Sequence, residues 1–230
     1  MLPTTSEKPR YVAAMFGRIA RRYDVMNTLM TGGQDARWRT LVARTLDGLA
    51  AGARVLDVGT GTGRLAQALV SRKASAQVTA VDFTLPMLLR APRNLALAAA
   101  DALVLPFADG QFDAVVSGFV VRNLADVEAG IAEQVRVLRP GGTLIILETT
   151  PGPAWPPLAW LYRLYFRRLV PFVGGLIAGD ASAYTYLPES TLRFTEPERL
   201  GDVLRANGLL DVRIRRLSFG CVAITTGRKQ

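Results

Sequence analysis

The chain has 230 residues, half of them hydrophobic and 20% charged, and these values predict one globular domain with a packed core over residues 1–230. The sequence has no histidine and a single cysteine, Cys221, which excludes an internal disulfide, a histidine-dependent catalytic triad and a histidine-based metal site. The net charge of +9 favours a polyanionic partner, such as nucleic acid or an anionic membrane surface, without choosing between them.

Residues 1–50 predict an N-terminal layer of helices. Apolar residues such as Val12 and Phe16 recur at helical spacing, and a second helix is expected after a Thr-Gly-Gly turn. Tyr23 and Asn27 are four residues apart, so they share a helical face. That face either covers a ligand site as a lid or makes ordinary hydrogen bonds within the fold.

Residues 51–150 predict a cofactor-binding α/β core. Short β-branched runs, such as TLIILE at 143–148, alternate with helical stretches, and this alternation is typical of parallel βαβ units. Residues 191–230 predict a closing helix and two strands joined at Ser218-Phe219, a connection short enough for an antiparallel hairpin. The fold expected is therefore a Rossmann-like, doubly wound sheet, mostly parallel, with an antiparallel edge.

A glycine-rich loop follows the first strand of this core. It contains Gly59, Gly61, Thr62 and Gly63 and opens a helix, where backbone amides are free to bind a ligand at close range. The loop alone is ambiguous, because residues 61–66 also fit the G-x-G-x-x-G/A dinucleotide fingerprint, with Asp82 about twenty residues on. A tight turn without any ligand is a further alternative.

Acidic residues at the strand ends favour S-adenosylmethionine over a nicotinamide. Asp57 lies inside the end of the first strand, where an acid could approach an ammonium group. Asp82 ends the next strand and could accept both ribose hydroxyls, and Asp101-Ala102 could meet the adenine amino group. A later Arg-Pro-Gly-Gly turn, residues 139–142, is a recurrent feature of class I methyltransferases. No metal ion is expected.

Several longer motifs resemble the ubiquinone/menaquinone biosynthesis C-methyltransferases. They include Tyr23 to Asn27 within the stretch from Met15 to Trp38-Arg39, Phe119 to Asn123, Asp180 to Ser190, and Leu217 to Ala223. The resemblance covers nearly the whole chain. It implies a class I fold with a helical lid and S-adenosylmethionine-dependent methylation of a polyprenylated quinol ring, with demethylmenaquinol as the expected substrate.

The chain also departs from that family pattern. Gly118 stands where relatives commonly have a polar residue, which would remove one side-chain contact to the cofactor, and Val120 replaces a usual glycine. Another lipid or small-molecule acceptor is therefore an alternative substrate. RNA is a further alternative, because the arginines and aromatic residues of 155–178 could also bind single-stranded nucleic acid.

The resemblance also implies roles at the substrate end. Arg122 would lower the pKa of a ring hydroxyl, Asn123 and Tyr184 would position the ring, and the proton would leave through water or a carboxylate such as Asp180. Tyr186 is expected beside them. The structural alternatives are an ion pair of Arg122 with Asp126, helix capping by Asn123, and anchoring of the loop by Tyr184.

Residues 151–190 predict a helical insertion that forms a lid and a membrane contact. Residues 155–178 carry an apolar helical face with arginines beside it, as suits a membrane interface, although Pro171 and a glycine pair are expected to break the helix. No secretory signal is expected, because residues 1–10 contain no apolar stretch after a basic start. The protein is expected to be cytoplasmic and peripherally bound to the inner face of the membrane, without a nucleic-acid partner, with a homodimer left open.

Overall fold

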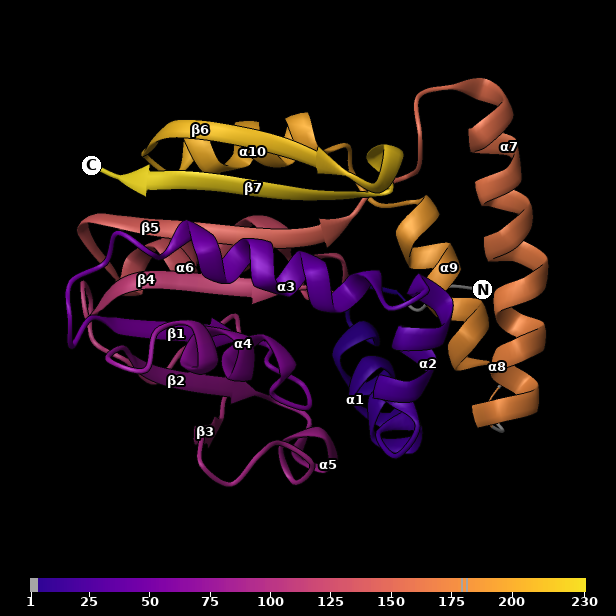
Figure 1. Ribbon diagram of the computed structural model, residues 1–230, viewed down its shortest axis with the longest axis horizontal. Coiled ribbons are helices and arrows are strands. Elements are labelled where there is room, and N and C mark those ends of the chain that lie inside the picture. The colour runs from indigo at the N-terminus through magenta and orange to yellow at the C-terminus, as the bar shows by residue number, and fades with distance from the viewer. Residues whose placement is uncertain (1–3, 179, 181) are drawn as a thin grey trace.

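The computed structural model describes residues 4–178, 180 and 182–230, and its centre is a seven-stranded sheet (Figure 1). The strand order is β3-β2-β1-β4-β5-β7-β6, in which β1 to β5 pair in parallel and β7 pairs antiparallel with both neighbours. The strands are β1 (Arg54–Val58), β2 (Gln77–Asp82), β3 (Ala96–Ala99), β4 (Phe112–Gly118), β5 (Leu138–Thr149), β6 (Leu209–Leu217) and β7 (Val222–Lys229). The expected doubly wound sheet with an antiparallel edge is confirmed.

Helices cover both faces of the sheet because its central strands are apolar on both sides. On one face, α3 (Gln34–Thr45) and α4 (Arg64–Arg72) pack Val42 and Leu69 against β1, β4 and β5. On the other face, α6 (Val127–Val137) and α10 (Pro197–Ala206) bury Ile131 and Leu204. These two apolar layers hold the strand ends rigidly in place.

A further helical layer covers the carboxyl ends of the parallel strands. It contains α1 (Lys8–Ile19), α2 (Tyr23–Thr31) and α9 (Ala183–Leu192), whose buried residues form a cluster with Met87 of the short helix α5 (Leu85–Leu88). The periodicity of the N-terminal segment suggested one helix up to the Thr-Gly-Gly turn. Instead, Arg22 leaves the helical conformation, and the chain bends between α1 and α2.

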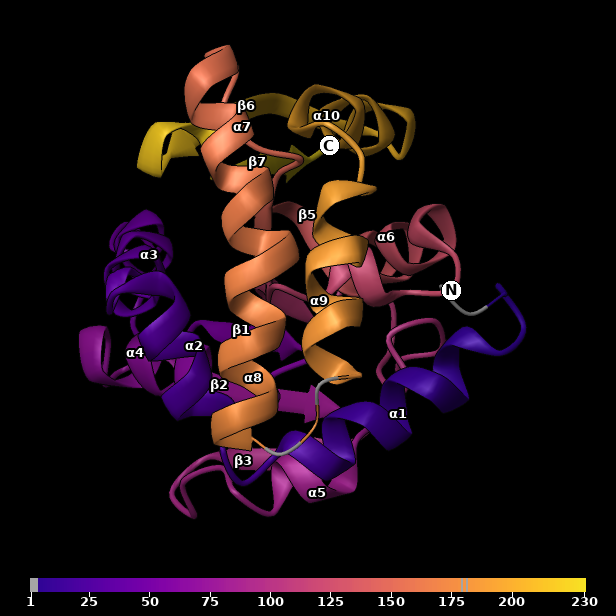
Figure 2. The same cartoon turned by 90° about the vertical axis from the view of Figure 1, so that its right-hand side faces the viewer.

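The insertion forms a long rod outside this layer (Figure 2). The helix α7 (Pro156–Leu164), a π-helical turn (Tyr165–Leu169) and α8 (Val170–Ala178) follow one another without a break, since Tyr165 and Val170 keep helical dihedrals. The expected break at Pro171 is therefore wrong. Proline lacks an N–H, and the π turn just before it changes the local hydrogen-bond pattern so that the helix can continue.

No helix within the described residues is long and apolar enough to cross a membrane.

Candidate active site

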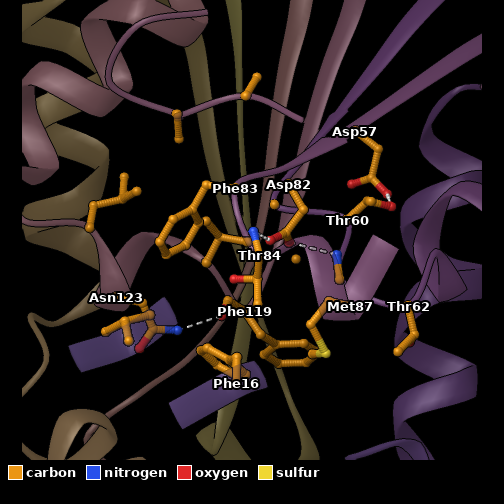
Figure 3. A pocket seen from close by; sticks show the side chains of 18 of the residues that line it. Phe16, Asp57, Thr60, Thr62, Asp82, Phe83, Thr84, Met87, Phe119 and Asn123 are labelled. Carbon is orange, nitrogen blue, oxygen red and sulfur yellow. Dashed lines mark hydrogen bonds between the residues drawn. The ribbon is translucent and has the colours of Figure 1, made fainter. Parts of the chain in front are cut away.

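The first of two neighbouring cavities lies at the carboxyl ends of β1, β2 and β4 and has an empty volume of about 1020 Å³. Its lining includes all but one of the residues expected at a cofactor site, and Figure 3 shows several of them around the open space. They are Asp57, Gly59, Gly61, Thr62, Asp82, Asp101, Ala102 and Gly118. Gly63 does not line the cavity but directly precedes α4. Open α/β sheets bind ligands at this edge.

The glycines of the loop are required by backbone conformation and by space. Gly59, Gly61 and Gly63 have φ values of 67°, 60° and 80°, a region that L side chains rarely adopt. A Cβ on Gly59 would lie 2.4 Å from a methyl group of Val120, so the loop touches the segment after β4 directly. The loop thus forms a bare backbone wall of the cavity.

Asp57 has a buried carboxyl group, of which only one oxygen is hydrogen-bonded within the described residues. Its Oδ2 accepts hydrogen bonds from Thr60 Oγ1 at 2.6 Å and from the Ala66 amide at 3.1 Å. Its Oδ1 is buried and has no hydrogen-bond partner among the described residues. Burial raises the pKa of this carboxyl to about 7. A buried acceptor without a partner is costly, so Asp57 fits a ligand that brings an ammonium group.

Asp82 and Asp101 are the other two carboxylates expected at the cofactor site, and both line the cavity. Asp82 accepts hydrogen bonds from the amides of Gly61 at 2.8 Å and Thr84 at 2.7 Å, and burial raises its pKa. Asp101 is exposed and accepts from the Leu103 amide at 2.9 Å. Each carboxylate keeps lone pairs for further donors, such as ribose hydroxyls or an amino group.

A second cavity, of about 1270 Å³, adjoins the first. Both cavities are lined by Tyr23, Arg39 and Phe119, so these residues separate them. Asn27 and Arg122 contribute polar groups to the second cavity, whereas α7 and the π turn line it with aromatic rings. Its lining therefore combines charged and polar groups with aromatic rings.

The comparisons with known proteins match this geometry. Residues 4–229 match the model of the ubiE/COQ5 methyltransferase family. The chain belongs to the ubiE/COQ5 methyltransferase family. A demethylmenaquinone methyltransferase of Thermus thermophilus is 46% identical over 223 residues, which cover 93% of this chain and 99% of that protein. A ubiquinone/menaquinone biosynthesis C-methyltransferase of Desulfotalea psychrophila is 42% identical and covers 95% of this chain and 90% of that protein.

Solved structures support the fold. A SAM-dependent methyltransferase from Aquifex aeolicus superposes with a TM-score of 0.60 at 19% identity, covering 90% of this chain and 98% of that chain. At this identity the likeness describes the fold alone. The chain is thus a methyltransferase of the expected family and fold class.

Within this ubiE/COQ5 methyltransferase, Arg122 forms a buried ion pair that sequence reasoning did not anticipate. Its Nη1 donates to Glu148 Oε1 at 2.6 Å and to the Phe119 carbonyl at 2.9 Å. Its Nε is buried without a partner among the described residues. The alternative pairing with Asp126 is wrong, because Asp126 caps α6 by accepting from the Ala129 amide at 2.9 Å.

Of the other residues expected at the substrate end, some line a cavity and others do not. Asn123 lines the first cavity, and its Oδ1 accepts a hydrogen bond from Tyr186 Oη at 3.4 Å. Asn123 Nδ2 donates to the Phe119 carbonyl, and η1 (Val121–Asn123) precedes α6, so Asn123 does not cap that helix. Tyr184 is fully buried and lines neither cavity.

Asp180 also lies apart from both cavities. It accepts a 2.7 Å hydrogen bond from Arg18 Nε, and its pKa is lowered to about 2 by its hydrogen bonds with Ser182 and Arg18, which outweigh burial. A carboxylate that an arginine already holds and that lines neither cavity is a poor acceptor for a ring proton. The geometry therefore does not support the expected role of Asp180.

Arg39 and Asp35 are site residues that sequence patterns did not single out. Asp35 is buried and accepts from Arg39 at 2.5 Å and from Arg64 at 2.7 Å. The Arg39 guanidinium also lies 5.7 Å from the centre of the Phe119 ring. The spacing of Asp35 and Arg39, four residues apart on one helix, is the signal that could have indicated their pairing.

No group of three or more Cys, Asp or Glu side chains is placed to hold a metal ion in residues 4–178, 180 and 182–230.

Proposed function

We propose that this enzyme transfers a methyl group from S-adenosylmethionine to a ring carbon of a polyprenylated quinol, with demethylmenaquinol as its substrate. The observation that carries the proposal is the pair of cavities that meet at Tyr23, Arg39 and Phe119, since methyl transfer needs donor and acceptor in adjoining sites. The names of the relatives support this substrate.

The first cavity fits the methyl donor. S-adenosylmethionine supplies a methyl group on a positively charged sulfur, which is already a strong electrophile. In our proposal, the free Oδ1 of Asp57 accepts from its ammonium group, and Asp82 accepts from the ribose hydroxyls. Asp101 and Ala102, which line the cavity, would lie beside adenine, and the glycine loop with Thr62 would lie against the methionine part. Gly118 offers only its backbone there.

The second cavity fits the quinol ring. A ring carbon becomes nucleophilic when a neighbouring hydroxyl loses its proton, and a phenol ordinarily does so near pH ~10. We propose that the unpartnered Nε–H of Arg122 donates to a ring oxygen and favours the phenolate. Asp35 is the only carboxylate in the described lining, and two arginines hold it, so the hydroxyl proton would leave through water. The ring carbon would then bond to the methyl group as the bond from methyl to sulfur breaks, with S-adenosylhomocysteine as the leaving group. Loss of the hydrogen from the methylated carbon to water and return of a proton to the ring oxygen would restore the aromatic ring.

The remaining residues position the ring and exclude bulk water. Tyr23 and Asn27 of α2 cover the acceptor cavity, and Asn123, fixed by Tyr186, orients the wall between the donor and acceptor sites. Tyr184 supports this wall from the core rather than touching the ring. No proton-accepting role is assigned to Asp180.

Labelled S-adenosylmethionine tests the reaction directly. Incubation with demethylmenaquinol should give labelled menaquinol by mass spectrometry, whereas the oxidised quinone should stay unmethylated because its ring is electron-poor. Asp82→Ala should weaken donor binding about ten- to hundredfold by calorimetry, the loss expected for one charge-assisted hydrogen bond.

Other outcomes would point elsewhere. Tight NADH binding without binding of S-adenosylmethionine would favour an oxidoreductase, and label in bulk RNA would favour the RNA alternative. Methylation of the quinone at the rate of the quinol would exclude activation by deprotonation.

We also propose that the enzyme reaches its substrate at an anionic membrane surface through the outer face of the α7–α8 rod. The rod lies in front of the sheet in Figure 2, and several of its large apolar side chains are exposed. Its arginines complement anionic headgroups.

A further inference from the structure

The turn between β6 and β7 (Ser218–Gly220) adopts a backbone conformation that its residues do not favour. Ser218 and Phe219 have φ values of 47° and 58°, in the left-handed region that non-glycine residues rarely enter. Strain of this kind persists only where the surroundings hold it, and it is concentrated at functional sites.

Three contacts hold this turn in place. Trp38 Nε1 of α3 donates a 3.1 Å hydrogen bond to Ser218 Oγ. Beyond the end of β5, the Thr150 amide donates to the Cys221 carbonyl at 3.0 Å, and the Thr150 hydroxyl donates to the Gly220 carbonyl. The turn is therefore fixed from both sides rather than free to relax.

This arrangement presents one large apolar side chain at the acceptor cavity. Phe219 lines the cavity, yet 85% of its surface is exposed, so it stands at the opening rather than in the interior. The packing of the fold does not need a phenylalanine there, because the side chain has little buried contact. We therefore expect the exposed ring of this strained residue to contact a ligand that enters the cavity.

The lining of the cavity indicates what that is. Arg122 and Asp35 are charged groups of its lining, and the rings of Tyr162 and Phe166, with centroids 4.5 Å apart, add an aromatic surface on α7 and the π turn. A prenylated quinol combines the same two chemistries, with oxygens on the ring and a hydrocarbon tail. The tail is too long to be enclosed with the ring, so it must leave through the opening, where Phe219 stands.

We propose that Phe219 positions the substrate by contacting the first isoprene units of its tail where they leave the acceptor cavity. The proposal rests on the proposed function and adds a residue that contacts the tail rather than the ring. The turn and α7 lie at the same end of the sheet (Figure 1), and Gly220 packs near Pro153 in the segment that leads to α7. The tail then passes toward the apolar outer face of the rod.

Tail-length dependence tests this proposal. Methyl transfer is measured in one detergent with two acceptors, a demethylnaphthoquinol that carries several isoprene units and the same ring without a tail. Phe219→Ala and Phe219→Gly should raise the KM for the prenylated acceptor about tenfold, as expected for loss of a side-chain-sized apolar contact. The kcat for that acceptor and the KM for the tail-less ring should not change.

The glycine variant separates tail contact from backbone strain. Phe219→Gly relieves the left-handed conformation and should raise the melting temperature, so a higher KM in a more stable protein cannot result from misfolding. Phe219→Leu should restore most of the affinity for the prenylated acceptor. Leu210→Ala removes an exposed apolar side chain of β6 that lines neither cavity, and its KM should equal that of the wild type.

An unchanged KM for the prenylated acceptor, or an equal rise for both acceptors, would overturn the role of Phe219 while leaving the proposed function intact. If the unaltered enzyme methylates neither acceptor, the proposed function fails, and the tail contact fails with it.

Discussion

At the scale of single residues, the chemistry depends on Arg122 being buried together with its partner. Arg122→Met alone leaves the Glu148 carboxylate buried without a counter-charge, which should cost about 3–5 kcal/mol of unfolding free energy. The double variant Arg122→Met/Glu148→Gln removes both charges and should recover much of that loss. We expect the double variant to bind S-adenosylmethionine but to turn over quinol far more slowly than the wild type.

Denaturant unfolding, calorimetry and turnover of the double variant measure stability, donor binding and chemistry separately. Wild-type turnover in a folded double variant would mean that Arg122 only supports the structure. Arg122→Lys keeps the charge but loses the Nε–H, so it should also turn over slowly.

Asp57 makes donor binding depend on pH. Burial raises its pKa to about 7, so the neutral form stabilises the fold below the ordinary carboxyl pKa, and that contribution is lost as the pH rises through 7. The ammonium group of the donor needs the ionised form, so its binding has the opposite pH dependence. Affinity for S-adenosylmethionine should be about tenfold weaker at pH 6 than at pH 7.5.

Calorimetry in buffers of different ionisation enthalpy would detect the proton released on binding at pH 6. Asp57→Asn is the control and should bind weakly at both pH values. If the affinity of Asp57→Asn for S-adenosylmethionine still changes between pH 6 and pH 7.5, another group titrates in this range.

At the scale of elements, the donor cavity depends on contact between the loop after β1 and the segment after β4. Gly59→Ala would place a methyl group 2.4 Å from Val120, so the two segments must separate, and we expect donor affinity to fall at least tenfold. Adding Val120→Gly should recover part of the loss by removing the clash.

Gly52→Ala is the matched control for this prediction. Gly52 has a φ of 77° but nothing within 4 Å of its Cβ position, so alanine there adds backbone strain without a clash. Donor affinity measured by calorimetry should be unchanged in Gly52→Ala. An equal loss in both variants would assign the effect to strain rather than to contact with Val120.

The order of the strands also explains which site residues could be predicted from the sequence. The glycine loop, Asp82 and Asp101 could be predicted to lie together because parallel strands end at one edge of the sheet, which depends only on strand order. The pairing of Arg122 with Glu148 could not be predicted, because it depends on β5 lying beside β4 with a particular register. The local signal favoured Asp126, which is closer in the sequence but occupied as a helix cap.

The insertion shows a second limit. Pro171 and the glycines predicted a break from local propensity, whereas packing of the rod on α2 and α9 outweighs that preference. The position of Tyr184 outside the cavities has the same origin, since the residues of α9 that face the core are set by this packing. Motifs indicated which segments matter but not which side of each helix meets the ligand.

At the scale of the whole molecule, apolar surface and positive charge coincide on the rod. Its exposed large apolar residues are Trp160, Leu161, Leu164, Leu169, Phe172 and Leu176, with Trp155 just before it. Such side chains in a cluster are unusual on a free surface and indicate an interaction site. Arg163, Arg167 and Arg168 belong to the same segment, and the net charge of +9 adds a long-range attraction to anionic surfaces.

Binding to vesicles should therefore have an electrostatic and an apolar part. Co-sedimentation with vesicles that contain anionic lipid should exceed that with neutral vesicles, and raising the salt should reduce the difference, because the Debye length falls from about 10 Å at 0.1 M to about 3 Å at 1 M. The combined variant Trp160→Ser/Phe172→Ser/Leu176→Ser should lose binding to neutral vesicles and bind anionic vesicles more weakly than the wild type, while keeping methyl transfer to a tail-less quinol. Leu210→Ser is the control, because Leu210 is similarly exposed but lies in β6 at the opposite end of the sheet, and it should bind like the wild type. If the combined variant binds as well as the wild type, the positive charge alone brings the enzyme to the membrane, and the rod serves only as a cover for the acceptor cavity.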